Sequence, residues 1–135
     1  LQIDGRDVAV YNLHPVHPGI GAHFFDPSYR YREIQDIMQR IAAEPLPVIA
    51  LGDFNLPLLS PDYELISARL TDAYRQVGWG LGLTYPGWGQ IPALLRLDYV
   101  FYDSSAFQAT RAHVLTHVRY SDHYPVHAEL ILKSQ

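Results

Sequence analysis

Cysteine is absent from this chain of 135 residues, and lysine occurs only once, as Lys133. Without cysteine the protein forms no disulfide bond of its own and no metal site that uses thiolate ligands. No apolar run approaches the ~20 residues that a membrane-spanning helix requires. These absences leave the cellular compartment open, and we expect any signal sequence or membrane helix to lie upstream of Leu1.

The charged residues are few and the basic ones are scattered. The net charge is -4 at neutral pH, and the arginines form no basic stripe. A protein that binds nucleic acid without sequence preference uses several lysine or arginine contacts to phosphates. The composition therefore disfavours a nucleic-acid substrate without excluding one. With 48% hydrophobic and 18% charged residues, the chain is typical of a soluble globular domain with one core.

Polar side chains that handle protons or metal ions adjoin apolar runs at several points. His14 follows the run 8–11, Asp53 follows the run 48–51, and Asp98 precedes the run 99–102. Residues in such positions lie at the rim of buried strands, where active sites are built. The segments that carry this pattern are Asn12-Leu13-His14, Gly52-Asp53-Phe54-Asn55, Arg96-Leu97-Asp98-Tyr99 and Ser121-Asp122-His123.

Strands and helices alternate in the expected secondary structure. Apolar residues at helical spacing predict a helix over 29–43, capped by Ser28 or Asp26 and ended by the prolines that follow it. Glycine, proline and tryptophan predict a long surface loop over 78–92. The remaining expected elements are strands over 6–13, 48–51, 97–102, 107–116 and 126–132, a helix over 62–70, and one or two helical turns over 72–77.

The order and spelling of the four polar segments resemble the endonuclease/exonuclease/phosphatase superfamily, which has the deoxyribonuclease I-like fold. GDFN and SDH are the most specific signatures, and the resemblance runs from Val8 to Leu130. It implies an α/β fold that is half of a two-sheet, helix-flanked, four-layer sandwich of mainly antiparallel or mixed strands. Family members carry an N-terminal half with an Asn and a metal-binding Glu. We therefore expect residues 1–135 to be the C-terminal part of one such domain, with its N-terminal half absent.

The resemblance also implies catalytic roles for five residues. Asp53 would orient or deprotonate a water molecule, and Asn55 would donate hydrogen bonds to that water or to phosphoryl oxygens. His123 would act on the phosphoryl group as a general base or as a cation, with Asp98 fixing its other ring nitrogen. His14 would face the leaving group. Each segment alone also has a structural explanation: GDFN could be a strand followed by an Asx-turn, and Asp122-His123 could be a cap.

A divalent metal ion is implied as well. Asp122 resembles the metal-ligand aspartate of the family, and Asp53 and Asn55 are the other metal ligands that we assign. Hard oxygen ligands with open water positions suit Mg²⁺, for which Mn²⁺ can substitute.

Substrate contacts are assigned to Trp79, Trp88 and Arg96. The loop that holds the two tryptophans corresponds to the family's substrate-recognition loop and is aromatic instead of basic. It suits a hydrophobic leaving group or a stacked base, but an equally weighted alternative is that both tryptophans fold back into a local core. Thr84-Tyr85-Pro86, followed by Arg96-Leu97-Asp98, further resembles a bacterial branch whose domain follows membrane helices. The location stays unknown, with the bacterial cytoplasm and a membrane-tethered or extracytoplasmic position both open.

The leading function is a Mg²⁺-dependent phosphoesterase that hydrolyses a phosphodiester or phosphomonoester of a lipid or small molecule by in-line attack of water. The alternatives are an endonuclease or exonuclease acting on DNA or RNA, and an inactive fragment or binding module. We expect an apolar sheet face, formed by the strands 8–11, 48–51 and 126–132, to be exposed in the chain alone. This face predicts self-association or binding of the absent N-terminal half.

Overall fold

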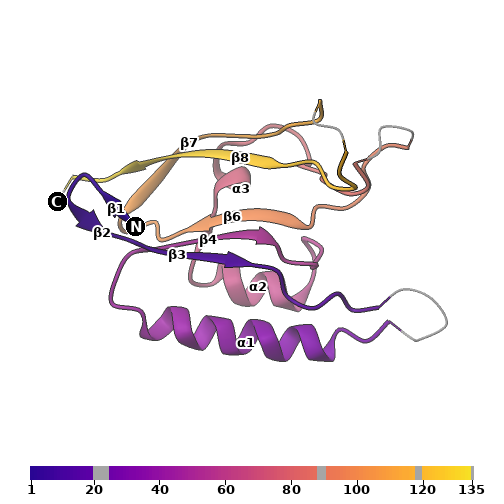
Figure 1. Cartoon of the computed structure of the whole chain (residues 1–135), viewed down its shortest axis with the longest axis horizontal. Helices are drawn as coiled ribbons and strands as arrows, with labels where there is room; N and C mark the ends of the chain where they lie inside the picture. The colour runs from indigo at the N-terminus through magenta and orange to yellow at the C-terminus, as the bar shows by residue number, and fades with distance from the viewer. Residues whose placement is uncertain (20–24, 88–90, 118–119, 135) are drawn as a thin grey trace.

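The computed structural model describes residues 1–19, 25–87, 91–117 and 120–134 (Figure 1). Its elements mix helices and strands, in agreement with the predicted α/β class. In chain order they are β1 (Gln2–Ile3), β2 (Arg6–Asp7), β3 (Ala9–Leu13), α1 (Ser28–Ala43), β4 (Val48–Asp53), α2 (Pro61–Ser67), β5 (Thr71–Asp72), α3 (Ala73–Val77), β6 (Asp98–Tyr102), β7 (Phe107–Val114) and β8 (Val126–Leu132).

A four-stranded mixed sheet with the order β3-β4-β6-β5 forms the centre of the molecule. β3 runs parallel to β4, to which it is joined through α1, while β6 is antiparallel to both β4 and β5. Figure 1 shows α1 and α2 on one side of this sheet and the β7-β8 hairpin on the other. The carboxyl ends of β3 and β4 and the start of β6 therefore meet at one edge of the sheet, away from the two chain termini.

Helix α1 forms as its apolar spacing predicts. Ile34, Met38 and Ile41 are buried together on the face that packs against the sheet. The start of the helix differs from the prediction, because Pro27 occupies the cap position and makes no side-chain cap bond. Asp26 instead accepts a hydrogen bond from the Ser28 backbone amide at 2.9 Å.

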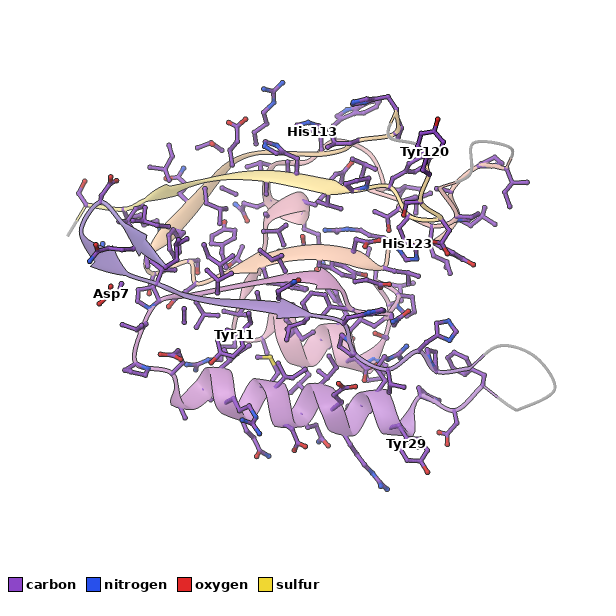
Figure 2. The ribbon with its side chains drawn as sticks, in the orientation of Figure 1. Asp7, Tyr11, Tyr29, His113, Tyr120 and His123 are labelled. Carbon is purple, nitrogen blue, oxygen red and sulfur yellow. The ribbon has the colours of Figure 1, made fainter. Side chains whose placement is uncertain are left out.

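The core beneath the helices is rich in aromatic rings. Phe54 meets Tyr99 edge to face with ring centroids 5.8 Å apart, and Tyr99 stacks on Phe101 at 5.3 Å. Figure 2 shows Tyr11 on the same side of the sheet, and its hydroxyl donates to a Glu44 carboxylate oxygen at 3.2 Å. Because Phe54 and Tyr99 directly adjoin candidate site residues in the sequence, this packing anchors the site to the core.

The β7-β8 hairpin is a separate two-stranded sheet. The expectation that strand 126–132 shares a sheet with strands 8–11 and 48–51 is therefore wrong. Phe107 of β7 is buried with Val8 and Tyr102 in a second core, and Leu130 of β8 packs against it. The hairpin thus covers part of the sheet face that was expected to be exposed. Val10 on that face still exposes 44% of its surface.

Other boundaries shift by a few residues. The expected strand 6–13 is divided into β2 and β3, and the helix expected over 62–70 ends at Ser67. The segment expected as a surface loop over 78–92 is not wholly exposed, because Thr84 is fully buried and Tyr85 bridges to Leu95. Within the described ranges, no helix combines the length and the apolar character that crossing a membrane requires.

Candidate active site

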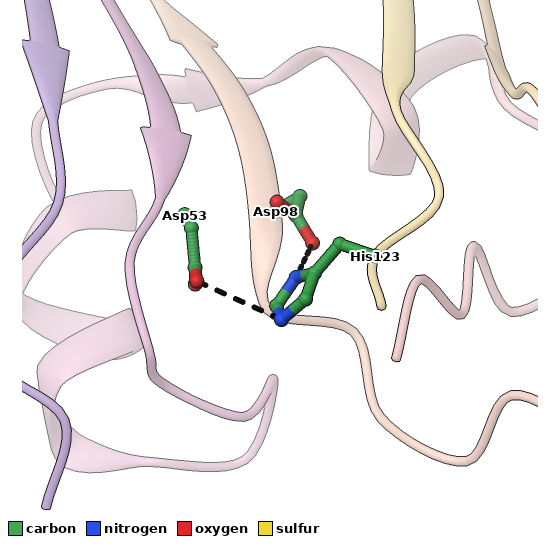
Figure 3. Close-up of side chains that lie close together, drawn as sticks. All are labelled: Asp53, Asp98 and His123. Carbon is green, nitrogen blue, oxygen red and sulfur yellow. Dashed lines mark hydrogen bonds and ion pairs between the residues drawn. The ribbon is translucent and has the colours of Figure 1, made fainter. Parts of the chain in front are cut away.

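Three side chains from separate segments meet at the edge of the central sheet (Figure 3). Asp53 ends β4 and Asp98 begins β6, and the antiparallel register places these two residues opposite each other. His123 lies between their side chains: its Nδ1 is 2.8 Å from Asp98 Oδ2 and its Nε2 is 3.8 Å from Asp53 Oδ2. The predicted contact between Asp98 and His123 is present.

The Asp53 side of the site depends on an unusual main-chain path. Gly52 has φ +136°, and a Cβ atom there would lie 2.0 Å from the Leu13 carbonyl oxygen of β3. Asn55 has φ +52°, in the left-handed region that asparagine tolerates better than most residues. Its backbone amide donates to Asp53 Oδ1 at 2.8 Å, which closes an Asx-turn. The Asx-turn alternative and the site arrangement therefore occur together.

Asn55 is buried and its side chain is held in place. Its Nδ2 donates to the Pro15 carbonyl at 2.9 Å, which ties the segment after β3 to the segment after β4. His14 directly precedes Pro15. Its side chain is 75% exposed, and its Nε2 lies 3.7 Å from Asp53 Oδ2. The structure thus brings all five predicted catalytic residues to one edge of the sheet.

Burial and hydrogen bonding act in opposite directions on the Asp98 carboxyl. Burial raises its pKa above the ordinary value, and hydrogen bonds from Thr84 and His123 counteract this effect without cancelling it. The nearby Asp53 carboxylate raises the pKa further. Asp98 is therefore a carboxyl whose charge depends on the donors around it.

The histidine side of the site rests on the loop that precedes β6. The Tyr85 ring lies 4.9 Å from the His123 ring, and the Gly87 backbone amide donates to the Asp122 carbonyl at 2.7 Å. The Tyr124 amide donates to the Thr84 carbonyl at 2.8 Å. In the sequence, Thr84 and Tyr85 carry only a resemblance to a bacterial branch. Their contacts to the site come from the folded chain, and no spacing signal indicates them.

A metal ion could be held by carboxylate and imidazole groups at this edge. Ligand atoms of Asp53, Asp98 and His123 lie within 4.8 Å of one another. The two carboxylates suit a hard divalent cation such as Mg²⁺ or Mn²⁺, whereas an imidazole is a ligand more typical of transition metals. Asp122, the ligand indicated by the resemblance, lines the adjoining pocket and is exposed, outside that group. Its metal role, like that of Asn55, stays a prediction.

A pocket of about 630 Å³ opens beside these residues. Its lining is largely apolar and includes histidine and carboxamide side chains. The lining residues are His14, His17, Pro18, Gly19, Phe25, Arg30, Asn55, Pro57, Tyr85, Leu95, Leu97, Asp122 and His123.

The three residues assigned to substrate contact have different positions. Trp79 is 93% exposed, so it does not fold back into a local core. Arg96 is only 3% exposed, and its Nη2 donates to Asp72 Oδ1 at 2.6 Å. Its guanidinium also lies over the Tyr99 ring, so the contacts of Arg96 are directed into the core, and its expected substrate contact stays a prediction. Trp88 lies outside the described residues.

Comparison with known proteins places the chain in a family. Residues 2–123 match the family model described as Endonuclease/Exonuclease/phosphatase family. Comparison with curated protein sequences finds no match.

Solved structures share the fold across nearly the whole chain. A mannosyl-6-phosphatase from Bacteroides thetaiotaomicron is 28% identical with a TM-score of 0.71, covering 95% of this chain and 52% of that one. An endonuclease/exonuclease/phosphatase family protein from the same organism is 26% identical with a TM-score of 0.74, covering 98% and 53%. The catalytic domain of APE2 from Xenopus laevis has the same fold at 17% identity and a TM-score of 0.71, covering 95% and 51%. The chain spans about half the length of these structures.

Proposed function

The chain belongs to the endonuclease/exonuclease/phosphatase family, and on this premise we propose that it supplies the catalytic C-terminal half of a metal-dependent phosphoesterase. The observation that carries the proposal is the contact of His123 with both Asp98 and Asp53 at the meeting point of β4 and β6. Water is a poor nucleophile and the leaving alkoxide departs with difficulty. An enzyme for this reaction therefore has to orient water and stabilise charge on the phosphoryl oxygens.

Each residue of the array has a distinct task in this proposal. Asp53 orients the attacking water or accepts its proton, and the Asn55 amide supports the phosphoryl group or that water. His123 contacts the phosphoryl oxygens, and the Asp98 carboxylate on its Nδ1 keeps the Nε2 edge turned toward Asp53. His14, which is exposed at the pocket rim, stabilises or protonates the departing oxygen.

A divalent cation, Mg²⁺ or Mn²⁺, completes the proposed site. Asp53 is the ligand common to the sequence-based assignment and to the cluster of carboxylates and imidazole in the fold. Asn55 and Asp122 are the further ligands that the sequence indicates. When bound, the ion neutralises negative charge on the phosphoryl group.

A small or lipid-like phosphoester suits the pocket better than a nucleic acid does. Phe25, Tyr85 and Leu95 give it an apolar wall. Among the described residues, its lining contains a single arginine, Arg30, whose charge is engaged by Asp62. Binding of a nucleic-acid backbone draws on several phosphate contacts that this lining does not offer. The similarity to a mannosyl-6-phosphatase favours a phosphomonoester of a small molecule.

A nuclease is the second candidate, because the APE2 catalytic domain has the same fold. In that case the N-terminal half, which the sequence indicates as a partner, supplies the basic surface. An inactive fragment or binding module is the third candidate. The partly exposed sheet face around Val10 is the proposed surface for that half or for self-association.

The deciding experiment measures phosphate or product release by the full-length protein from a sugar 6-phosphate, a lipid phosphodiester and a DNA oligonucleotide, with Mg²⁺ and with EDTA. We expect Mg²⁺-dependent turnover of a non-nucleic-acid substrate, lost in Asp53→Ala. Turnover restricted to DNA would establish the nuclease alternative. Absence of turnover on every substrate class would contradict a phosphoesterase.

A further inference from the structure

A buried ion pair lies directly behind the Asp53 side of the site. Arg30 belongs to α1 and Asp62 to the first turn of α2, and both side chains are 3% exposed. Arg30 Nε donates to Asp62 Oδ2 at 2.7 Å, and Nη2 lies 2.6 Å from the same oxygen. The third nitrogen, Nη1, donates to the backbone carbonyl of Asn55. All three guanidinium nitrogens are therefore committed to Asp62 and Asn55.

Stability alone does not account for such a pair. Removing two charges from water costs several kcal/mol per ion, and replacing a buried pair by apolar side chains of similar size is often neutral or stabilising. Ile34 and Leu56 nearby are fully buried, so the surroundings suit apolar packing. The contact that an apolar pair cannot reproduce is the hydrogen bond to the Asn55 carbonyl.

Asn55 is the residue whose placement sets the turn of the site. Its left-handed φ of +52° is strained, and its amide bond to Asp53 Oδ1 holds that carboxylate in place. The donor from Arg30 fixes the carbonyl on the other side of the same residue. A turn that relaxes by about 1 Å is enough to lower a reaction rate by roughly a hundredfold.

We propose that Arg30 and Asp62 are positioning residues that hold the Asp53–Asn55 turn in its catalytic conformation. The proposal rests on the proposed phosphoesterase function. Arg30 contributes to the reaction only through Asn55: its charge is matched by Asp62, and it is not a phosphate ligand.

A second buried pair provides a matched comparison. Arg96 and Asp72 are 2% exposed at their side chains and 2.6 Å apart, and no hydrogen bond between this pair and Asn55 is present in the described residues. A conservative change in this pair alters a buried charge of the same kind without touching the turn.

The test replaces the pair by apolar residues in the full-length protein, as R30M/D62L. We expect a melting temperature within about 5 °C of the wild type. We also expect kcat to fall roughly tenfold to a hundredfold, with KM changed by no more than about twofold. A stable double variant with wild-type kcat would overturn the proposal, because the pair would then be structural only.

A second readout does not depend on activity. Hydrogen exchange of the Asn55 backbone amide, followed by NMR, is expected to be faster in R30M/D62L and in Arg30→Lys, since lysine cannot serve Asp62 and Asn55 together. Arg96→Lys is the control and should leave Asn55 exchange unchanged. Unchanged exchange in both Arg30 variants would overturn the proposal. Failure of both variants to fold would also overturn it, because the role of the pair would then be structural stability. If the wild type hydrolyses no phosphoester, the proposed function fails while the exchange data still decide whether the pair positions Asn55.

Discussion

The two sides of the candidate site are held in place by different means. On the Asp53 side, the main chain itself is constrained, through a glycine at position 52 that no other residue can replace without a clash and a left-handed Asn55. On the His123 side, main-chain hydrogen bonds from Gly87 and Tyr124 hold the segment. The imidazole itself is oriented by side chains, because Asp98 bonds the imidazole and Thr84 bonds Asp98.

This difference predicts how each side fails. A backbone-held group is lost when one residue no longer fits its conformation, and the loss is accompanied by a loss of stability. A group held by side-chain hydrogen bonds changes in smaller steps, because one functional group can be altered while the backbone stays in place. The predictions below test this contrast in order of expected effect.

The largest effect is expected where the two sides meet. Asp53→Ala and His123→Ala should each lower turnover of the full-length protein at least a hundredfold, on the order of 3 kcal/mol of transition-state stabilisation. EDTA should abolish wild-type activity, and Mg²⁺ or Mn²⁺ should restore it. Steady-state kinetics measure all of these. Asp53→Asn serves as the control for the turn, since it keeps an acceptor for the Asn55 amide. Full activity in chelator would remove the metal from the mechanism.

The next effect concerns the backbone of the Asp53 side. Gly52→Ala places a Cβ atom 2.0 Å from the Leu13 carbonyl oxygen, so β3 and β4 must separate. We expect a loss of about 3 kcal/mol of unfolding free energy, measured by denaturant titration. Gly80→Ala is the control, because Gly80 has φ +81° but no atom within 4 Å of its would-be Cβ. Equal losses in the two variants would show that the close approach to β3 is unimportant.

The His123 side is expected to separate activity from stability. Burial raises the folded-state pKa of Asp98 above its ordinary value of 3.8. The folded state therefore binds the Asp98 proton more tightly than the unfolded state does. The stability that this difference contributes is fully present below pH 3.8 and is lost as the pH rises through the folded-state pKa. Asp98→Asn does not ionise, so its stability relative to the wild type should increase over that same rise in pH, while turnover falls roughly tenfold or more as His123 loses its partner.

Unfolding free energies in EDTA, measured from below pH 3.8 to neutral pH, check the first part of this prediction. The kinetics of the same variant check the second. A relative stability that falls with rising pH would show that the hydrogen bonds to Asp98 outweigh its burial.

The smallest effect is expected at Thr84, which hydrogen-bonds Asp98, the partner of the His123 imidazole. Thr84→Val keeps the shape of a fully buried side chain but removes its hydrogen bond to Asp98 and the acceptor of the Leu97 amide at 3.1 Å. We expect a loss of about 1 to 2 kcal/mol in unfolding free energy and a further rise in the pKa of Asp98. Thr110→Val on the exposed surface of β7 is the control, with an expected change within about 0.5 kcal/mol. An effect of Thr84→Val as small as that of the control would remove Thr84 from the support of the site.

Local signals in the chain were sufficient for most of the fold. The apolar spacing of α1 predicts its length within one residue, because the burial of Ile34, Met38 and Ile41 follows directly from helical periodicity. The strands carrying Asp53 and Asp98 were also predictable, since each is a short apolar run bounded by polar residues. The sheet to which strand 126–132 belongs was not predictable. This strand, β8, pairs with β7 and not with β4, because packing selects the strand partners.

The candidate site divides in the same way. The sequence by itself determined the residue types that meet there, because Asp53, Asn55, Asp98 and His123 belong to short signatures in a fixed order. Only the tertiary structure decided which buried charges serve the site. Arg96 lies two residues before Asp98 in the sequence, but its side chain is buried in the core.

Arg30 belongs to a helix that is distant in sequence, and its guanidinium donates a hydrogen bond to the carbonyl of Asn55. Arg30 and Arg96 are chemically identical, and each is buried against an aspartate. The physical reason for their different roles is that a buried guanidinium bonds whichever acceptors the packed elements bring within its reach, and that choice is made by the placement of helices and strands in three dimensions.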